Sequence, residues 1–515
     1  MTLSTSVAMT ATTERHLLDR LVRADGQEDL CLATYRPSTG ATRCTALIAS
    51  AIAAEPGERH VHGTATITGK YVLRAAGIAR AEGSGLVLLH SHPGATRWQP
   101  MSGPDRTAEA SYANLVREFT GLPLVGMTLA TGDTTWSARH WNRGVGQEVD
   151  CTHANNVRVV GGQLAVSWND TLAPRPEATH RQVRTVSAWG NRCQADLARR
   201  RILVVGAGSV GLDVVVRLAA SGVRHLTVMD FDLVEDRNLD RLIGATPRDA
   251  RLLRPKIHTA RRQARAAATD ATPIIESSNL SICEPSGLQL ALDHDLIFCC
   301  VDRPWPRAVL NALAYSDLIP IIDGGIAIDT FDDGTMRNAT WRTHVIRPGR
   351  PCMSCNGQLD LGLVQPDKEG LLDDPEYIAA MADSATSLGQ NVATLSAGVS
   401  AGLLAQYTSL SVGPGGLGDP GPLRYALSTH LLEHLDCTTR PHCPVEPIEG
   451  AGDARQKLTD HHLTAEFQRE RAANPGKHVR LRRWVDDRND QISRWLERGS
   501  TSPPQRLRRT ASDWD

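Results

Sequence analysis

The stretch Arg201–Gly211, RILVVGAGSVG, decides the fold of the second half of this chain. Its first five residues form an apolar run that is typical of a strand buried on both faces of a parallel sheet. The next six have the spacing Gly-x-Gly-x-x-Gly, which lets backbone amides approach a phosphate at the N-terminus of a helix. We therefore predict a strand, a glycine turn and a helix that continues to about Ser221.

The same alternation of strand and helix repeats downstream. Apolar runs end at Asp230 (HLTVMD), Asp302 (DLIFCCVD) and Asp323 (IPIID), and helical stretches separate them. Strands that alternate with helices indicate a doubly wound parallel sheet of the Rossmann-like type. We expect this α/β domain to span residues 181–445.

The region upstream has a different pattern, typical of an α+β domain. A helix is expected over residues 105–120, capped by Ser102 or Asp105. Apolar runs typical of strands occupy 28–36 (EDLCLATYR), 86–90 (LVLLH) and 123–130 (PLVGMTLA).

These patterns divide the chain into four parts. We predict an α+β domain over residues 1–150, a linker over 151–180, the α/β domain over 181–445 and a charged tail over 446–515. The end of that tail has the composition of a disordered segment.

Composition excludes several classes of protein. Lys plus Arg number 56 and Asp plus Glu 57, a balance that argues against a bulk nucleic-acid binder. The sequence has no apolar run of about 18 residues and no secretory signal near its start, so we expect a cytoplasmic protein that does not cross a membrane. Eleven cysteines in such a protein are more often reduced or metal-bound than disulfide-bonded.

The segment His90-Ser-His-Pro, followed by Ser102-Gly-Pro-Asp105, indicates a zinc hydrolase. Histidines two residues apart on an extended segment point the same way, and neutral imidazoles suit zinc. Asp105 would be the third protein ligand beside His90 and His92. A hydroxyl at Ser102 could stabilise a developing oxyanion, and a general base must still handle the protons of the attacking water.

This pattern resembles the JAMM/MPN metalloprotease family, in which an upstream Glu precedes His-x-His-Pro and Ser-x-x-Asp. The resemblance implies a catalytic zinc and cleavage of peptide or isopeptide bonds after the C-terminus of ubiquitin-like proteins. Glu28 opens a strand-like run and is the favoured general base, while Glu55 and Glu58 lie in a Pro-Gly turn and are weaker alternatives. A chance His-x-His or a metal-free relative would carry no such activity.

The glycine loop alone would also fit an NAD enzyme, in which Asp230 would hold a ribose. A dehydrogenase does not need the dense polar set that follows. Basic groups neutralise phosphate charge and carboxylates hold magnesium, so this set suits a triphosphate with Mg²⁺. Its members are Asp230, Asp232, Asn238, Arg241, Lys256 and Asp302.

Over residues 181–445 this order of elements resembles the ThiF/MoeB family, the adenylating domain shared with ubiquitin-activating enzymes. The resemblance implies ATP as cosubstrate and attack of a C-terminal carboxylate on its α-phosphate. The implied ATP-site residues are Gly206, Gly208 and Gly211 in the loop, Asp230 at the ribose, Asp302 at the magnesium, and Asn238, Arg241 and Lys256 at the phosphates. Arg184, or Arg181, would be the leading arginine, which in dimeric members reaches the partner's ATP site, so we expect a homodimer.

Two features of the cysteines bear on that resemblance. Cys352-x-x-Cys355 matches the family's first zinc pair, and Cys437 with Cys443 would complete a structural zinc site, although their spacing differs from Cys-x-x-Cys. The alternative is independent buried thiols without metal. Residues 356–436 contain no cysteine, so the thioester that many family members form there is not possible. A separate thiol or sulfur donor would then attack the adenylate, unless another cysteine such as Cys299 or Cys300 serves.

One hypothesis joins the two halves. The hydrolase would trim residues beyond a diglycine on a ubiquitin-like or sulfur-carrier protein, and the adenylating domain would activate the exposed carboxylate. Alternatively one half attaches the modifier, with a conjugating enzyme or sulfur donor as a further partner, and the other removes it. The remaining hypotheses are a hydrolase-like domain that only presents the carrier, and an NAD-dependent oxidoreductase with an accessory domain.

Overall fold

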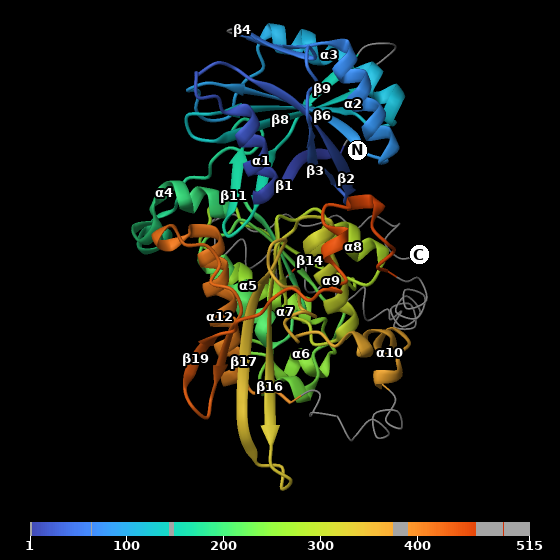
Figure 1. Ribbon diagram of the computed structural model, residues 1–515. Helices are drawn as coiled ribbons and strands as arrows, with labels where there is room; N and C mark the ends of the chain where they lie inside the picture. The colour runs from blue at the N-terminus through green and yellow to red at the C-terminus, as the bar shows by residue number, and fades with distance from the viewer. Residues whose placement is uncertain (1–2, 63, 144–148, 374–389, 460–487, 489–515) are drawn as a thin grey trace, which may run out of the picture. The chain divides into compact units, whose positions relative to one another are not determined.

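A computed structural model describes residues 3–62, 64–143, 149–373, 390–459 and 488 (Figure 1). Two large sheets organise residues 3–459, which form one compact unit. No helix in these described ranges is long and apolar enough to cross a lipid bilayer.

The N-terminal half is built on a nine-stranded mixed sheet in the order β11-β10-β1-β3-β2-β6-β7-β8-β9. Helix α1 packs on one face and helices α2 and α3 on the other, each through a separate apolar cluster. The strands are β1 (Ser4–Thr10), β2 (Leu30–Thr39), β3 (Arg43–Ile52), β6 (Gly85–His92), β7 (Leu124–Ala130), β8 (Thr135–Arg143), β9 (Val149–His153), β10 (Asn156–Val160) and β11 (Leu164–Trp168). The helices are α1 (Ala11–Leu21), α2 (Gly69–Ala81) and α3 (Gly103–Thr120), and a separate hairpin joins β4 (Arg59–His62) to β5 (Thr64–Ile67).

The predicted strands and helix of this half are confirmed by β2, β6, β7 and α3. The predicted linker over 151–180 is wrong for its first part, because β9 ends there and β10 and β11 follow. Strand β10 pairs in parallel with β1, so this segment completes the sheet. The run NVRVV of β10 is buried throughout, and its short length hid it beside the polar residues that flank it.

The second half is an eight-stranded sheet in the order β14-β13-β12-β15-β16-β17-β18-β19. Its first five strands are parallel and the last three are antiparallel, which confirms the doubly wound core and adds a hairpin extension. The strands are β12 (Arg201–Val205), β13 (His225–Met229), β14 (Ile274–Ser278), β15 (Leu296–Cys299), β16 (Ile321–Thr330), β17 (Met336–Ile346), β18 (Leu423–Ala426) and β19 (Leu431–His434).

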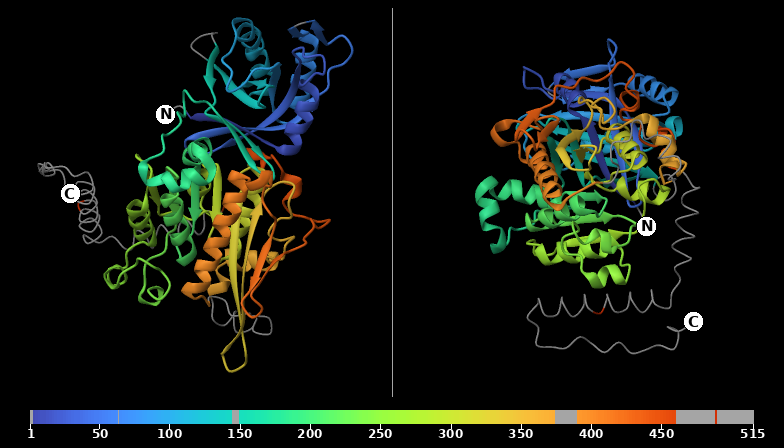
Figure 2. Two further views of the ribbon diagram at one scale, coloured as in Figure 1. Left: turned by 90° about the vertical axis from the view of Figure 1, so that its left-hand side faces the viewer. Right: turned by 90° about the horizontal axis from the view of Figure 1, so that it is seen from below.

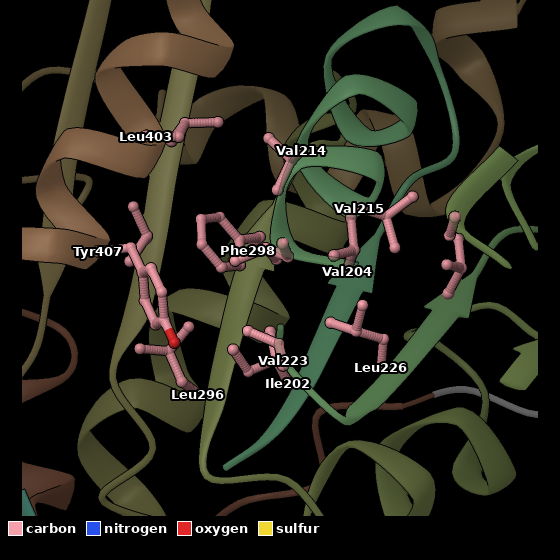
Figure 3. Close-up of a cluster of buried hydrophobic side chains, with 14 of the residues drawn as sticks. Ile202, Val204, Val214, Val215, Val223, Leu226, Leu296, Phe298, Leu403 and Tyr407 are labelled. Atoms are coloured by element: carbon pink, nitrogen blue, oxygen red, sulfur yellow. The ribbon is translucent and has the colours of Figure 1, made fainter. Parts of the chain in front are cut away.

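Helices flank this second sheet, and α12 packs along the long β16–β17 hairpin (Figure 2). They are α4 (Val183–Arg199), α5 (Ser209–Ala220), α6 (Pro247–Arg251), α7 (Lys256–Ala267), α8 (Pro285–Ala291), α9 (Pro304–Ser316), α10 (Val364–Lys368) and α12 (Ala393–Val412). The core between α5, α12 and the central strands is apolar (Figure 3). In it the rings of Phe298 and Tyr407 lie 5.8 Å apart between centroids, a tilted contact that aromatic pairs favour.

The tail predicted over 446–515 is structured at its start. Residues Glu446–Ile448 and Gly452–Ala454 form short 3₁₀ turns, and Asp453 accepts hydrogen bonds from the backbone and hydroxyl of Thr39 at 2.9 and 2.6 Å. The disorder predicted for the end of the tail lies outside the described residues.

Buried charges tie the two sheets together. A single oxygen of Asp295, just before β15, lies 2.6 Å from a guanidinium nitrogen of Arg43 on β3 and 2.6 Å from one of Arg158 on β10. All three side chains are almost fully buried, and the second Asp295 oxygen accepts the backbone N–H of Arg201 at 3.0 Å. The two arginines hold the pKa of the Asp295 carboxyl well below its ordinary value against the opposing effect of burial.

Changing Asp295 to Asn is therefore expected to destabilise the protein by about 3–5 kcal/mol, because two buried guanidinium groups would lose their only shared carboxylate. Urea unfolding at neutral pH measures this loss. The control is Asp213→Asn, which removes an exposed pair with Arg217 on α5 and should change stability by less than about 1 kcal/mol. Equal effects of the two changes would contradict the role of Asp295.

Candidate metal and nucleotide sites

Three predicted metal ligands converge at the end of β6. His90 and His92 point the same way from the last residues of this strand, and Asp105 reaches them from the first turn of α3. The Nε2 atoms of the two histidines are 3.2 Å apart. Asp105 Oδ2 lies 3.6 Å from His90 Nε2 and 3.8 Å from His92 Nε2. A tetrahedral zinc with bonds of about 2.0–2.1 Å separates its ligand atoms by about 3.4 Å, so this donor set fits zinc in spacing and chemistry.

Neighbouring groups orient these ligands. Gln99 Oε1 lies 3.3 Å from His92 Nδ1, which places a proton on that nitrogen and leaves the Nε2 lone pair for a metal. The hydroxyl of Thr128 lies 3.3 Å from His90 Nε2. Interactions with His90 first and His92 second hold the pKa of Asp105 far below its ordinary value, and the same carboxylate raises the pKa of His92.

Ser102 has a structural role that the sequence predicted. It caps α3 in a capping box, in which its Oγ accepts the Asp105 N–H at 3.2 Å and its own N–H is donated to Asp105 Oδ2 at 3.2 Å. The cap therefore fixes the position of a metal ligand. Because the hydroxyl accepts in this cap, its proton stays available for an oxyanion beside the metal ligands.

The register of β2 against β6 places Glu28 beside the histidines. Leu30 pairs with His90, and the next ladder bond runs from the Ser91 N–H to the Asp29 carbonyl at 2.9 Å. One further step puts Glu28 opposite His92, on the face that carries the two imidazoles. Its charge contributes to the raised pKa of His92, after Asp105, which is consistent with this proximity.

The alternative bases are engaged elsewhere. Glu58 is buried, and its carboxylate lies 2.5 Å from the guanidinium of Arg74. Its other role is to accept the backbone N–H of Glu55, which closes the turn before β4. Glu55 is about half exposed and pairs loosely with Lys70 at 3.5 Å. Of the three carboxylates, Glu28 is the one that the extended β2–β6 register brings to the histidine pair.

The glycine loop lies between β12 and α5, at the topological switch of the second sheet. Strand β12 has β13 on one side and β15 on the other, so the loop opens at the carboxyl ends of three parallel strands. Gly206 has φ of 96°, and a Cβ there would lie 2.5 Å from the carbonyl oxygen of Cys300. A Cβ on Gly211 would overlap the Gly206 carbonyl, whereas one on Gly208 would meet open space, which is where a phosphate could approach.

The acidic residues after β13 organise this loop. One oxygen of Asp230 accepts the Ala207 N–H at 2.6 Å and the other accepts the Asp232 N–H at 2.7 Å. Burial, followed by the charge of Asp232, raises the pKa of Asp230. Lys256, the first residue of α7, lies 2.7 Å from Asp232 Oδ2 through its Nζ atom, so a basic group stands beside the loop.

The other predicted nucleotide residues lie around the same edge or farther away. Asn238 ends a 3₁₀ turn after β13, and Arg241 follows it, donating to the Arg237 carbonyl at 2.7 Å. Asp302 is exposed between β15 and α9. The strand predicted to end at Asp302 ends three residues earlier, at Cys299, so β15 is shorter than the apolar run. Arg184 and Arg181 are exposed at the start of α4.

Sequence reasoning missed a hydroxyl and amide cluster at the N-terminus of α5. Ser209 Oγ accepts the Asn391 side-chain N–H at 3.0 Å and the Ser396 hydroxyl at 2.8 Å. Ser209 lies within the glycine motif, but its partners are 182 and 187 residues away in sequence, so no local signal could reveal them.

Three of the four predicted cysteine ligands gather in one buried cluster. Cys352, Cys355 and Cys443 place their sulfur atoms within 4.8 Å of one another, and those of Cys352 and Cys443 are 3.7 Å apart. Tetrahedral zinc with Zn–S bonds of about 2.3 Å separates its sulfurs by about 3.8 Å, so the spacing fits a zinc site. The backbone N–H of Arg440 is donated to Cys355 at 3.4 Å, while Cys437 lies outside the cluster.

Comparison with known proteins bears on the second half of the chain. Residues 179–418 match the model of the ThiF family. This part of the chain is a ThiF-type domain. The match covers the parallel sheet, the glycine loop and the polar residues after β13 and β15.

Curated relatives match the same kind of domain. The molybdopterin-synthase adenylyltransferase of Escherichia coli is 32% identical over 150 residues, which are 27% of this chain and 58% of that protein. The adenylyltransferase and sulfurtransferase UBA4 of Yarrowia lipolytica is 30% identical over 176 residues, 33% of this chain and 39% of that protein. The chain thus spans less than two thirds of the length of these relatives. A solved structure of MccB from E. coli with ATP is 16% identical, covers 52% of this chain and 74% of the other, and has a TM-score of 0.41.

Changing Cys443 to Ser is expected to remove one zinc ion per chain and to lower the melting temperature of the ThiF-type domain, because a buried cluster would lose one of its three gathered sulfurs. Zinc analysis and calorimetry of the whole protein measure both effects. The matched control is Cys437→Ser, which lies outside the cluster and should leave zinc content unchanged. Equal zinc loss in both variants would show that Cys437 is the fourth ligand.

Proposed function

We propose that the ThiF-type domain adenylates the C-terminal carboxylate of a ubiquitin-like or sulfur-carrier protein, and that the N-terminal half is a zinc peptidase of the JAMM/MPN type acting on the same modifier. The observation that carries the first part is the contact of Asp230, at the carboxyl end of β13, with the Ala207 N–H of the glycine loop, while Lys256 pairs with the neighbouring Asp232. Asp302 follows β15, the parallel neighbour of β12. The relatives that match this domain include enzymes named as adenylyltransferases.

The chemistry of the domain follows from these residues. The amides around Gly208 and the N-terminus of α5 take the phosphates of ATP, and Asp230 takes the ribose. Asn238, Arg241 and Lys256 neutralise the triphosphate, and Asp302 holds Mg²⁺. A carrier carboxylate oxygen then forms a bond to the α-phosphorus, the bond to the bridging oxygen breaks, and pyrophosphate leaves.

The acyl adenylate passes to a separate thiol or sulfur donor in this proposal. Cys299 and Cys300 are the cysteines next to the nucleotide loop, but burial raises the pKa of both thiols well above the ordinary value. A buried neutral thiol is a poor nucleophile. Arg184, or Arg181, takes the place of the family's leading arginine in this proposal. Both are exposed at the start of α4, where they could reach the ATP site of a second copy in a homodimer.

The N-terminal half supplies the hydrolytic groups. His90, His92 and Asp105 hold the zinc, which when bound acts as a Lewis acid toward the scissile carbonyl. Glu28 accepts a proton from the attacking water and returns it to the leaving amine. The Ser102 hydroxyl donates to the developing oxyanion.

Trimming and activation are consecutive in the coupled function that we propose. Cleavage after a diglycine leaves the free carboxylate that adenylation requires, so one domain makes the substrate of the other. Removal of an attached modifier is the competing use of the same peptidase. A carrier-presenting scaffold without peptidase activity and an NAD-dependent oxidoreductase are the remaining outcomes.

The deciding experiment is ATP–pyrophosphate exchange with ubiquitin-like proteins encoded near this gene, each supplied both ending in diglycine and with extra C-terminal residues. We expect exchange with the extended form only when Glu28 and His90 are intact, and exchange with the trimmed form in either case. If the unchanged protein supported exchange with the trimmed form and not with the extended form, the trimming model would be overturned, and removal of an attached modifier would be favoured. NAD-dependent turnover without pyrophosphate exchange would overturn adenylation.

A further inference from the structure

A cavity of about 390 Å³ lies apart from the residues of the two candidate metal sites and of the nucleotide site. It is formed by the start of β11, the second half of α4 and Ser411 at the end of α12. Its volume is within the range of small-ligand sites, about 300–1,000 Å³. The lining residues are Gln163, Leu164, Ala165, Val166, Trp189, Arg192, Cys193, Asp196, Arg200 and Ser411.

Arg200, directly after α4, is a buried cation in this cavity, and no carboxylate of the described residues pairs with it. Only 3% of the residue is exposed. Its guanidinium donates to the Ser411 hydroxyl and, at 3.0 Å, to the Leu164 carbonyl, and its Nε has no hydrogen-bond partner in the part of the chain that the structure describes. None of the ion pairs in the described part of the chain includes Arg200. Asp196 also lines the cavity, but its carboxylate pairs with Arg199 at 2.5 Å.

The charge of Arg200 is only partly compensated. Its position at the C-terminus of α4 places it against a helix dipole worth about half a negative charge. That contribution leaves a net positive guanidinium, and the exposed Arg192 adds a second cation to the lining of the same cavity. An uncompensated buried charge costs folding free energy, so the arrangement favours an anionic ligand that pairs with it.

The cavity also opens on a free sheet edge. Among the described strands, β11 is the last of the nine-stranded sheet and pairs only with β10. The Gly161 N–H donates to the Gln163 carbonyl at 3.2 Å, so these two residues are a hydrogen-bonded pair of the β10–β11 hairpin. In an antiparallel ladder such pairs alternate with pairs that share no hydrogen bond. The backbone groups of Leu164 and Val166 therefore point away from β10, and the bond from Arg200 to the Leu164 carbonyl agrees with this direction.

We propose that this cavity binds the C-terminal carboxylate of an extended peptide, which adds to β11 as an antiparallel strand. The carboxylate pairs with Arg200 and Arg192, and peptide backbone groups pair with Val166. Arg200 lies at the Leu164 end of β11, so a segment that ends there runs opposite to this strand. Addition of a peptide to a sheet edge is an established recognition mode, in which main-chain hydrogen bonds give affinity. The proposal depends on neither catalytic activity.

The test uses the full-length protein and a fluorescein-labelled peptide, KTVSVT, with either a free C-terminal carboxylate or a C-terminal amide. Fluorescence anisotropy is expected to show the free acid binding roughly 10- to 100-fold more tightly, the effect of a charge-assisted hydrogen bond of about 1.5–3 kcal/mol. Arg200→Gln and Arg192→Gln should each reduce the ratio of acid to amide affinity, and Arg200→Gln should reduce it to less than about threefold. The affinity for the peptide amide should change little in either variant.

Two controls keep the result decisive. Arg217→Gln removes an exposed guanidinium on α5 that pairs with Asp213 and should keep the full difference between acid and amide. Arg192 is exposed, so its variant tests the proposal even if Arg200→Gln lowers the melting temperature. N-methylation of single peptide amides, one position at a time, should weaken binding at every second position only, because alternate residues of an added strand donate their N–H to β11.

Two outcomes would overturn the proposal. Equal binding of acid and amide by the unchanged protein would exclude carboxylate recognition at Arg200. If glycylglycine displaced the labelled peptide and bound as tightly as the longer peptide does, the cavity would be a site for small anions and no strand would be added to β11.

Discussion

Changing Glu28 to Gln is expected to lower cleavage of a carrier protein with extra C-terminal residues by roughly 10²–10⁴-fold. The glutamine keeps the shape of the side chain but cannot accept a proton from the attacking water. When the β2–β6 register is continued by two residues beyond Leu30 and His90, Glu28 stands opposite His92. Mass spectrometry of the carrier after incubation with the zinc-loaded protein measures the rate.

The matched control is Glu55→Gln, an exposed carboxylate in the turn before β4, which should cleave at the unchanged rate. Zinc content should stay the same in both variants, because neither residue is a proposed ligand. If Glu55→Gln lost cleavage activity while Glu28→Gln kept it, Glu55 and not Glu28 would be the general base. No cleavage by the unchanged, zinc-loaded protein would favour the scaffold hypothesis.

Changing Lys256 to Ala is expected to lower ATP–pyrophosphate exchange with the trimmed carrier by about 10²–10³-fold, the usual cost of losing one group aimed at developing charge. Lys256 Nζ lies 2.7 Å from Asp232 beside the glycine loop, and alanine suits the helix that begins there. Exchange of labelled pyrophosphate into ATP at saturating Mg²⁺ gives the rate.

The control is Arg217→Ala, which removes an exposed cation on α5 and should leave exchange within about twofold. Peptidase activity should be unaffected in Lys256→Ala, which separates the two halves. An unchanged exchange rate in Lys256→Ala would contradict the placement of the triphosphate beside the glycine loop.

Local patterns predicted much of the fold. The run RILVV and the glycine turn became β12 and the loop before α5, and the cap at Ser102 begins α3. Each of these depends on neighbours within a few residues, whose geometry the backbone fixes directly. The strand NVRVV of β10 was mistaken for linker, because what makes it a strand is pairing with β1, far away in sequence.

The candidate sites divide in the same way. Spacing in the sequence determined that His90 and His92 share one side of a strand and that a glycine turn joins β12 to α5, since period-two alternation and the positive φ of Gly206 are local properties. Only the tertiary structure decided that Glu28 stands opposite His92 while Glu58 is paired with Arg74, and that Cys443 rather than Cys437 joins Cys352. It alone left Arg200 buried with no carboxylate partner among the described residues. The physical reason is that strand register, burial and ion pairing join residues from distant segments, whose distances the sequence does not contain.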